Sequence, residues 1–427
     1  MDLLSSQAIY RQLEPFCGSG RWLVAYSGGL DSTVLLHCLC GLRQQYSLPE
    51  LCALHVNHQL SAAADEWQRH CESTCRSLGV EFITERVVVP KDGAGPEAAA
   101  RNARYGLFER YLGAGECLLQ AHHLDDQVET FLLRLLRGAG LAGLAAMPSQ
   151  RPLGQGTLLR PLLSWTRQQL ADHAVGQGLS WVEDDSNQDL ALDRNYLRKQ
   201  ILTRLERRWP AYRNSIGTAI EAARESDAAV LEYFAPKLDE LMGCAHGEFT
   251  LSLSSWGKLE ELARRQLLRA WLRRLNCRMP ERKALVEFVR QVGDADAPGR
   301  AELRSADYCL RRYRNRLFLA LAKTGEPPRP HFKTTPGRGI SVARGGQLRV
   351  AVRKGGERCR PAGRQHSQTL KKLLREYQVP PWQRKNLPLV FNERDQLVAV
   401  ADLWVCEGFQ ATAGEPGLEL GWHGQEG

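Results

Sequence analysis

The sequence WLVAYSGGLDSTVLLHC, residues 22–38, decides the fold. Its first five residues form a short apolar run with the composition of a buried strand. The run breaks into the turn SGGLDS at residues 27–32, and residues 33–38 fit the first turns of a helix. A strand that turns through two glycines into a helix directs free backbone N–H groups and a positive helix end toward one point. The stretch therefore predicts an anion site, most simply for phosphate.

The residue types of this turn favour a nucleotide accompanied by a cation. Asp31 would repel phosphate unless a cation lay between them, so we expect Asp31 to hold Mg²⁺. The turn has neither the Gly-Lys-Ser/Thr of a Walker loop nor the spacing GxGxxG. SGGLDS resembles the pyrophosphate loop of the N-type ATP pyrophosphatases, which cut ATP between its α and β phosphates. The resemblance implies that ATP is bound by Ser27, Gly28, Gly29, Leu30, Asp31 and Ser32, and a plain strand-to-helix turn is the alternative.

Strand and helix patterns alternate along the first part of the chain, which predicts an α/β fold with a doubly wound parallel sheet. We expect strands at residues 22–26, 51–56, 80–89 and 117–121, and helices at residues 62–78 and 97–112 and from residue 128. Ligands of such sheets bind beyond the carboxyl ends of the strands. SGGLDS, HVNHQ at 55–59 and AHHLDDQ at 121–127 should therefore line one crevice.

A second polar cluster, HHLDDQVET at residues 122–130, follows the fourth strand. Asp126 and Glu129 are three residues apart, which places both carboxylates on one face of a helix. Paired carboxylates at a strand end can hold Mg²⁺ or an ammonium group, and the alternative is capping of the helix N-terminus. A zinc site would need a further ligand beside His122, His123 and an aspartate.

Several cations could contact a phosphate or carboxylate, although each is also a candidate for a solvated surface side chain. In the first part of the chain these are Arg101, Arg104, Arg137, Arg160, Arg194 and Arg198, the last two after the acidic segment EDDSN at 183–187. In the tail, Lys371, Lys372 and Arg375 precede a Pro-Pro-Trp sequence that contains Trp382. The tail residues suit a nucleic-acid surface, and a helix followed by a core tryptophan is the alternative.

Length and charge bound the organisation of the chain. Its 427 residues predict two to three domains, which we place at 1–215, at a helical, arginine-rich 216–325, and at a mixed α+β 340–427 after a linker at 326–339. Residues 1–215 carry a net charge of −1 and residues 216–427 one of +10. A basic half beside a nucleotide-binding half favours a nucleic-acid partner, and solubility charge on helical faces is the alternative.

Cysteine usage and hydropathy predict a cytoplasmic protein. The twelve cysteines form no CxxC and fit buried thiols in a reducing compartment. The first residues lack the pattern of a signal peptide, and no apolar run approaches the ~20 residues of a membrane span.

The ordered set of motifs resembles that of the tRNA(Ile)-lysidine synthetases over nearly the whole chain, most weakly over residues 216–330. The motifs are HVNHQL at 55–60, ARNARY at 100–105, HHLDDQVET at 122–130, RGAGLAGL at 137–144, RPLL at 160–163, EDDSN at 183–187, RNYLR at 194–198 and KKLLREYQVPPWQRKNLPLV at 371–390. The resemblance implies that ATP adenylates carbon 2 of the wobble cytidine of a tRNA(Ile) with a CAU anticodon. The ε-amine of free L-lysine then displaces AMP and leaves lysidine.

The resemblance also implies roles for the residues named above. Asp31, Asp126, Glu129 and Arg104 would be catalytic, with Asp31 on Mg²⁺ and the pair Asp126 and Glu129 on the lysine ammonium. Asp125, Arg101, Arg137, Arg160, Arg194, Arg198, Lys371, Lys372, Arg375 and Trp382 would contact substrates. No DNA or membrane partner is expected, and a homodimer is left open. The alternatives are a tRNA thiolase, which the missing CxxC disfavours, and a non-catalytic ATP-dependent tRNA-binding protein.

Overall fold

A computed structural model describes residues 4–57, 59, 63–87, 96–183, 190–245, 248–293, 301–321, 330–385 and 387–422 of the chain. The chain divides into two compact units, Met1–Ala229 and Val230–Gly427. Within the described residues, no helix is both long enough and apolar enough to cross a lipid bilayer.

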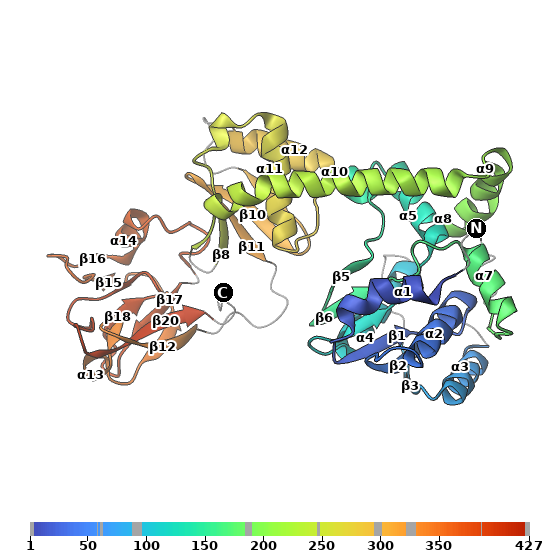
Figure 1. Cartoon of the computed structure of the whole chain (residues 1–427). Coiled ribbons are helices and arrows are strands. Elements are labelled where there is room, and N and C mark those ends of the chain that lie inside the picture. The colour runs from blue at the N-terminus through green and yellow to red at the C-terminus, as the bar shows by residue number, and fades with distance from the viewer. Residues whose placement is uncertain are drawn as a thin grey trace. The chain divides into compact units, whose positions relative to one another are not determined.

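The first unit is built on a six-stranded sheet with the order β3-β2-β1-β4-β6-β5 (Figure 1). Its strands are β1 (Arg21–Ala25), β2 (Glu50–Asn57), β3 (Glu81–Arg86), β4 (Cys117–Leu119), β5 (Gln150–Leu153) and β6 (Gly156–Leu159). All described pairs are parallel except β5 with β6. The predicted doubly wound parallel sheet is thus confirmed, with an antiparallel strand added at one edge.

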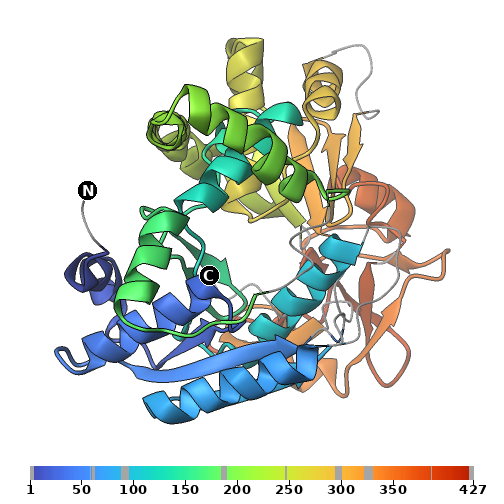
Figure 2. The same cartoon turned by 90° about the vertical axis from the view of Figure 1, so that its right-hand side faces the viewer.

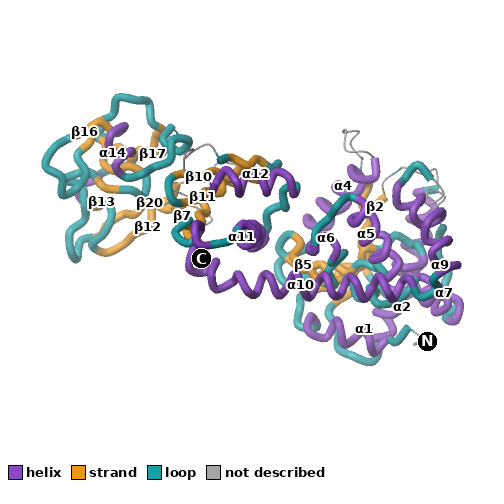
Figure 3. Tube along the Cα trace, turned by 90° about the horizontal axis from the view of Figure 1, so that it is seen from above, coloured by secondary structure: helices purple, strands orange, loops and turns teal. Residues whose placement is uncertain are grey.

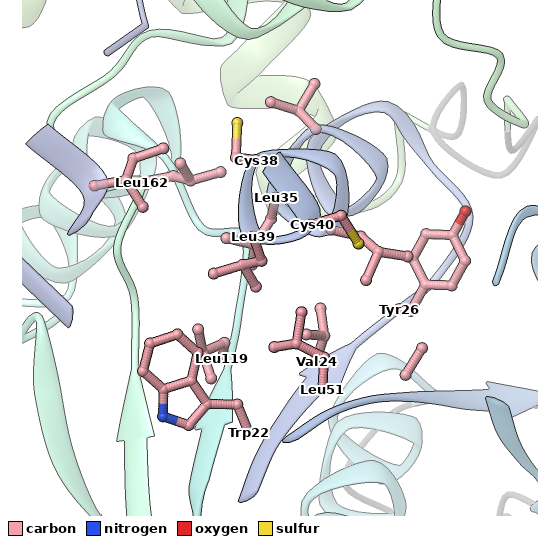
Figure 4. Packing of buried hydrophobic residues seen from close by; sticks show 14 of the residues in the cluster. Trp22, Val24, Tyr26, Leu35, Cys38, Leu39, Cys40, Leu51, Leu119 and Leu162 are labelled. Atoms are coloured by element: carbon pink, nitrogen blue, oxygen red, sulfur yellow. The ribbon is translucent and has the colours of Figure 1, made fainter. Parts of the chain in front are cut away.

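Helices cover both faces of this sheet because its central strand is apolar on both sides. Trp22 and Val24 of β1 pack with α2 (Leu30–Arg43) in one cluster, which Figure 4 shows around Leu35 and Leu39. Leu23 belongs to a second cluster on the opposite face. The helices around the sheet are α1 (Ser6–Leu13) with the short η1 (Glu14–Phe16), α3 (Ala64–Leu78), α4 (Pro96–Tyr111) and α7 (Arg167–Gly176), and α3 lies along β2 and β3 (Figure 2).

The strand order changes direction between β1 and β4. From β1 the chain moves outward through β2 and β3, and it then returns to add β4 and β6 on the other side of β1. In open α/β sheets such a switch point is where ligands bind. SGGLDS follows β1, and the segment after β4 leads into α5 (Leu124–Leu136), so both predicted clusters lie at this point.

A set of helices completes the first unit. These are α6 (Leu141–Leu144), α8 (Asp193–Tyr196), the π-helical turn η3 (Leu197–Leu202), α9 (Thr203–Arg208) and the first part of α10 (Tyr212–Leu241). Val128 of α5 packs with Leu197, Leu202 and Tyr212 in a small core that holds η3 against α5. Helix α10 follows without a break after Tyr212, and Figure 3 shows it as one continuous helix.

The second unit begins with helices on an antiparallel sheet, which is more sheet than the predicted helical region 216–325. Its strands are β7 (Met242–Ala245), β8 (Glu248–Ser252), β9 (Glu302–Arg304), β10 (Tyr308–Tyr313) and β11 (Arg316–Leu321), in the order β7-β8-β11-β10-β9. The helices are α11 (Glu261–Arg274) and α12 (Arg282–Gly293), with the short η4 (Trp256–Lys258). Strands β10 and β11 form a hairpin around residues 314–315. The other strands are too short to show a clear alternation of apolar residues in the sequence.

The remainder of the second unit consists of short strands and two short helices. These are β12 (Pro330–Pro336), β13 (Ile340–Ser341), α13 (Val342–Gly345), β14 (Arg349–Val352), β15 (Arg358–Cys359), β16 (Gln368–Thr369), α14 (Leu370–Glu376), β17 (Pro388–Phe391), β18 (Leu397–Val400), β19 (Trp404–Val405) and β20 (Pro416–Trp422). Part of the segment expected as a linker at 326–339 is instead strand β12, paired antiparallel with β20. Pro330 and Pro336 stand at the two ends of β12, where a missing N–H costs little.

Candidate active site

The turn at the end of β1 is held in shape by its own hydroxyl groups. The Ser27 and Ser32 hydroxyl oxygens lie 3.1 Å apart, and Ser32 Oγ also donates to the Gly29 carbonyl at 3.1 Å. Thr33 Oγ1 donates to the Gly28 carbonyl at 3.3 Å. The turn thus presents the first backbone N–H groups of α2 at the carboxyl end of the sheet, as an anion site requires.

Asp31 lies in the first turn of α2 and has one carboxylate oxygen left over. No hydrogen bond reaches its buried Oδ1 from the described residues. Its other oxygen, Oδ2, lies 3.6 Å from Nε2 of His123. A buried carboxylate oxygen without a donor is costly unless a cation or a proton satisfies it. The position predicted for a Mg²⁺ ligand therefore has the donor atom that Mg²⁺ would need.

His123 joins the two predicted clusters. Its side chain is 2% exposed, and its ring nitrogens lie 3.5–3.7 Å from carboxylate oxygens of Asp31, Asp125 and Asp126. Burial alone would lower the pKa of His123, but the charges of Asp126, Asp31 and Asp125 outweigh burial and raise the pKa. No pattern in the sequence indicated that this histidine, rather than a carboxylate, stands at the centre of the group.

Asp126 is held ionised by the cations around it. Its Oδ2 accepts the backbone N–H of His123 at 3.1 Å, which caps α5, and its Oδ1 lies 3.6 Å from Arg194 and 3.8 Å from Arg198. Burial would raise the pKa of Asp126, but the charges of His123, His122 and Arg194 lower it below its usual value. Both readings of this residue from the sequence, cap and charged site residue, therefore describe the same side chain.

Glu129 is fully buried and already bound to two guanidinium groups. Its Oε2 accepts from Nε of Arg194 at 2.7 Å, and its Oε1 accepts from Nε of Arg198 at 2.6 Å. A third bond runs from Nη2 of Arg198 to Oε2 at 3.0 Å. The structure therefore places Asp126 and Glu129 on one face of α5 as predicted, but the charge of Glu129 is directed to the chain's own arginines instead of to a free ammonium group.

Asp125 ties three helices together. Its Oδ2 accepts the backbone N–H of Arg167 at the start of α7 at 2.8 Å, and its Oδ1 accepts from Nε of Arg213 on α10 at 2.6 Å. Both oxygens are thus occupied, which indicates a structural role for a residue expected to contact substrate. The sequence did not identify Arg213, because it lies 88 residues along the chain from its partner.

The other predicted arginines of the first unit lie in different surroundings. Arg160 is buried and donates to the Pro148 carbonyl at 2.8 Å, and the guanidinium of Arg101 lies 5.1 Å from the centre of the Tyr105 ring. Burial lowers the pKa of His122 to about 3, and the charges of Arg160, Arg194 and Arg101 act in the same direction. These three arginines thus lie close enough to His122 to act on its charge. Half-buried Arg104 lies on α4, and exposed Arg137 pairs with Asp193 at 3.1 Å.

In the segment HVNHQ at 55–59, the side chains of His55 and Asn57 bond to other residues of the first unit. The buried His55 contacts the Tyr26 carbonyl at 2.9 Å through Nδ1, and burial lowers its pKa. Asn57 donates to Gln68 at 3.0 Å and to Asp65 at 3.3 Å. His58 lies outside the described residues, as does all of EDDSN after Glu183.

The tail residues divide into exposed cations and a packed tryptophan. Lys371, Lys372 and Arg375 of α14 are exposed. Trp382 makes edge-on contacts with Tyr313 and Phe318 at centroid distances of 6.0 and 5.8 Å, and its Nε1 donates to Glu248 at 3.4 Å. Trp382 is half-buried, with the Arg311 guanidinium 5.2 Å from the centre of its ring, so its surroundings lie between the two readings from the sequence.

Comparison with known proteins agrees with this arrangement. A PP-loop domain model matches residues 4–205, a TilS substrate binding domain model matches residues 251–318, and a TilS substrate C-terminal domain model matches residues 348–422. The tRNA(Ile)-lysidine synthase of Serratia proteamaculans is 38% identical over 98% of this chain and 99% of its own. That of Pseudomonas aeruginosa is 43% identical over 92% of each chain, and that of Coxiella burnetii is 35% identical over 99% of this chain and 96% of its own. With these relatives spanning nearly its full length, the chain belongs to the tRNA(Ile)-lysidine synthase family.

Proposed function

We propose that the crevice at the switch point of the first sheet joins ATP, L-lysine and the wobble cytidine of tRNA(Ile). The chain is an ATP-dependent ligase that attaches lysine to that cytidine. One observation carries the assignment of this crevice. Carboxylate oxygens of Asp31, in the turn at residues 27–32 (the phosphate loop), and of Asp126, in HHLDDQVET, lie 3.6 and 3.5 Å from Nε2 of the buried His123, although the two aspartates are far apart in sequence. Nucleotide chemistry and an amine-binding carboxylate can therefore operate side by side.

ATP would lie with its phosphates on the turn at residues 27–32. The first N–H groups of α2 and the hydroxyls of Ser27 and Ser32 would contact the phosphates that leave as pyrophosphate. Asp31 would hold Mg²⁺ through its unpartnered Oδ1. When bound, the ion would neutralise charge that develops on the leaving pyrophosphate as the wobble base is adenylated.

The lysine side chain would approach Asp126. Because the pKa of Asp126 is lowered, its carboxylate stays negative and can attract an ammonium group. Free lysine has a side-chain pKa of about 10.4, so its ε-amine must lose a proton before it attacks. Asp126 would hold the ammonium close to the adenylated base and accept its proton, after which the neutral amine would attack carbon 2 and AMP would leave.

Glu129 would act through the arginines that it orients. Three short hydrogen bonds fix Arg194 and Arg198, and a guanidinium nitrogen of each lies within 4 Å of Asp126. These arginines, together with Arg101 and Arg104, would steady the phosphate of the adenylated intermediate. Glu129 is then a positioning residue, in place of the direct contact with lysine that the sequence suggested.

The second unit would hold the body of the tRNA. The part of the chain from residue 216 carries a net charge of +10, and the exposed cations Lys371, Lys372 and Arg375 are grouped on α14. Basic side chains bind the phosphate backbone without reading its sequence. A cytoplasmic location stays a prediction from the sequence, and a homodimer stays open.

The test is to incubate the full chain with Mg-ATP, radiolabelled lysine and total bacterial tRNA. Label that stays on tRNA after alkaline deacylation is expected, because lysidine is a base modification and not an ester. Absence of stable label would contradict the proposal and leave only a tRNA-binding role.

A matched pair of variants tests the assignment of Asp31. Asp31→Ala should abolish incorporation of label while tRNA affinity stays close to that of the parent chain. Asp172→Ala removes an exposed carboxylate from α7 of the same unit and should leave incorporation unchanged. If Asp31→Ala weakens tRNA binding as much as it weakens incorporation, the separation between ATP site and tRNA surface is wrong.

A further inference from the structure

Gly28 of the phosphate loop is enclosed by two residues from other parts of the first unit. A Cβ atom built on Gly28 would lie 2.6 Å from Sγ of Cys71 and 3.2 Å from Cγ2 of Val182. Cys71 belongs to α3, and Val182 belongs to the extended segment after α7. The thiol of Cys71 therefore fills the volume that a side chain at position 28 would take.

The backbone at Gly28 also needs this residue type. Its φ of +81° lies in the left-handed region, which glycine adopts at little cost. Any other residue would combine backbone strain with the clash against Cys71. The left-handed backbone at Gly28 and the position of the Cys71 thiol therefore both require glycine at position 28.

The carbonyl of Gly28 is fixed from two sides. The backbone N–H of Val182 donates to it at 3.0 Å, and Thr33 Oγ1 donates to it at 3.3 Å. Because a peptide unit is planar and trans, a fixed carbonyl also fixes the opposite direction of the next N–H, that of Gly29. The Gly29 N–H also donates to Ser27 Oγ at 3.4 Å within the turn. The orientation of this backbone donor therefore depends both on that hydrogen bond and on the contacts behind the loop.

The two supporting residues are themselves anchored. Cys71 is fully buried in the core beside the phosphate loop, with Cys75 one turn further along α3. Leu179 and Trp181 pack against the same core and hold the segment that carries Val182. Burial, followed by the nearby Cys75, raises the pKa of the Cys71 thiol to about 12, so this thiol is neutral and serves as a packing group.

We propose that Cys71 and Val182 are positioning residues for ATP, which hold the Gly28-Gly29 peptide in the orientation that the phosphates require. This inference rests on the proposed function only in that the loop binds ATP. Preorganised donors bind more tightly than donors that must be ordered on binding. Loosening the back of the loop should therefore weaken ATP binding even where the fold survives.

The experiment measures the Kd of α,β-methylene-ATP, which cannot be cleaved, by calorimetry with the full chain. Cys71→Ala removes the thiol behind Gly28 and should raise the Kd about tenfold. Cys71→Ser keeps a group of similar size there and should stay within about threefold of the parent chain. Cys75→Ala is the matched control, since it removes a fully buried thiol from the same helix. It should lower the melting temperature similarly but leave the Kd within about twofold.

The outcomes distinguish failure of the proposed function from failure of the inference about Cys71 and Val182. If the parent chain does not bind the analogue, the proposed function fails and takes the inference with it. If the parent chain binds it, but Cys71→Ala and Cys75→Ala change the Kd equally, the inference alone is overturned. Should Cys71→Ala not fold, Cys71→Val and Cys75→Val provide the same comparison, with weaker binding expected only for the crowded position 71 and equal binding overturning the inference.

Discussion

Replacing Glu129 by glutamine should destabilise the first unit strongly, although the two side chains have nearly the same shape. Glu129 accepts three hydrogen bonds of 2.6–3.0 Å from two guanidinium groups. A glutamine amide retains one acceptor oxygen and turns an NH₂ group toward a guanidinium donor. The substitution therefore leaves the positive charges of Arg194 and Arg198 at the junction of α5 and η3 with only the more distant Asp126 carboxylate, at 3.6 and 3.8 Å, as counter-charge.

The size of the effect follows from the burial of the partners. Removing one member of a buried ion pair typically costs 3–5 kcal/mol. The side chains of Arg194 and Arg198 are 28% and 35% exposed, so water can solvate part of the released charge. We therefore expect a loss of about 2–3 kcal/mol in the free energy of unfolding. For a unit of this size, that corresponds to a drop of roughly 4–12 °C in melting temperature.

Scanning calorimetry of the full chain measures this drop. Glu221→Gln is the matched control, because Glu221 pairs with Arg224 but is 59% exposed. Its loss should stay below about 0.5 kcal/mol. Adding Arg198→Leu to Glu129→Gln should recover part of the lost stability, since one unpaired guanidinium is removed. A melting temperature for Glu129→Gln equal to that of Glu221→Gln would refute the reasoning, because these ion pairs would then not hold η3 against α5.

Three further expectations concern acidity, packing and charge. Burial lowers the pKa of His122 to about 3, so below pH 6.5 the unfolded chain binds a proton that the folded chain does not. The free energy of unfolding should therefore fall on acidification by about 1.4 kcal/mol per pH unit from this group, and His122→Asn should give a shallower acid slope in urea titrations; equal slopes would contradict this. Trp382→Ala should lower the melting temperature but leave the tRNA affinity found by filter binding nearly unchanged, because the ring packs against neighbouring aromatic side chains. A loss of tRNA affinity at an unchanged melting temperature would support the base-stacking role instead. Replacing Lys371, Lys372 and Arg375 together by alanine should lower tRNA affinity and reduce the slope of log K against log salt concentration by up to about 2.7, and an unchanged slope would exclude them from phosphate contacts.

The doubly wound sheet and the position of its ligand crevice could be predicted because both depend on local patterns. An apolar run of strand length before SGGLDS, and another before HHLDDQVET, indicate buried strands with polar carboxyl ends. Parallel connectivity then brings those ends together at a switch point. The meeting of Asp31 with Asp126 follows from topology alone.

The detailed roles within the site depend on partners that local patterns do not reveal. From the sequence, Glu129 was expected to bind lysine and Asp125 to contact substrate. The structure shows that Glu129 instead bonds to Arg194 and Arg198, and that Asp125 bonds to Arg213. Trp382 shows the same limit, because only tertiary contacts distinguish a packed ring from an exposed one. The sequence shows which residues are charged, but it does not show which partner each charged side chain contacts.

The pairing of β12 with β20 has a consequence for the order in which the chain can fold during synthesis. Every strand of the first sheet lies between Arg21 and Leu159, so that sheet can form while the ribosome is still translating the second unit. Strands β12 and β13 both pair with β20. Phe332 therefore cannot form its backbone pairing until Leu420 has been synthesised. During that interval β12 is an unpaired edge strand that other chains or chaperones can contact. Ribosome stalling between residues 340 and 415 should therefore leave a chain that can already bind ATP but is prone to aggregate through its C-terminal part.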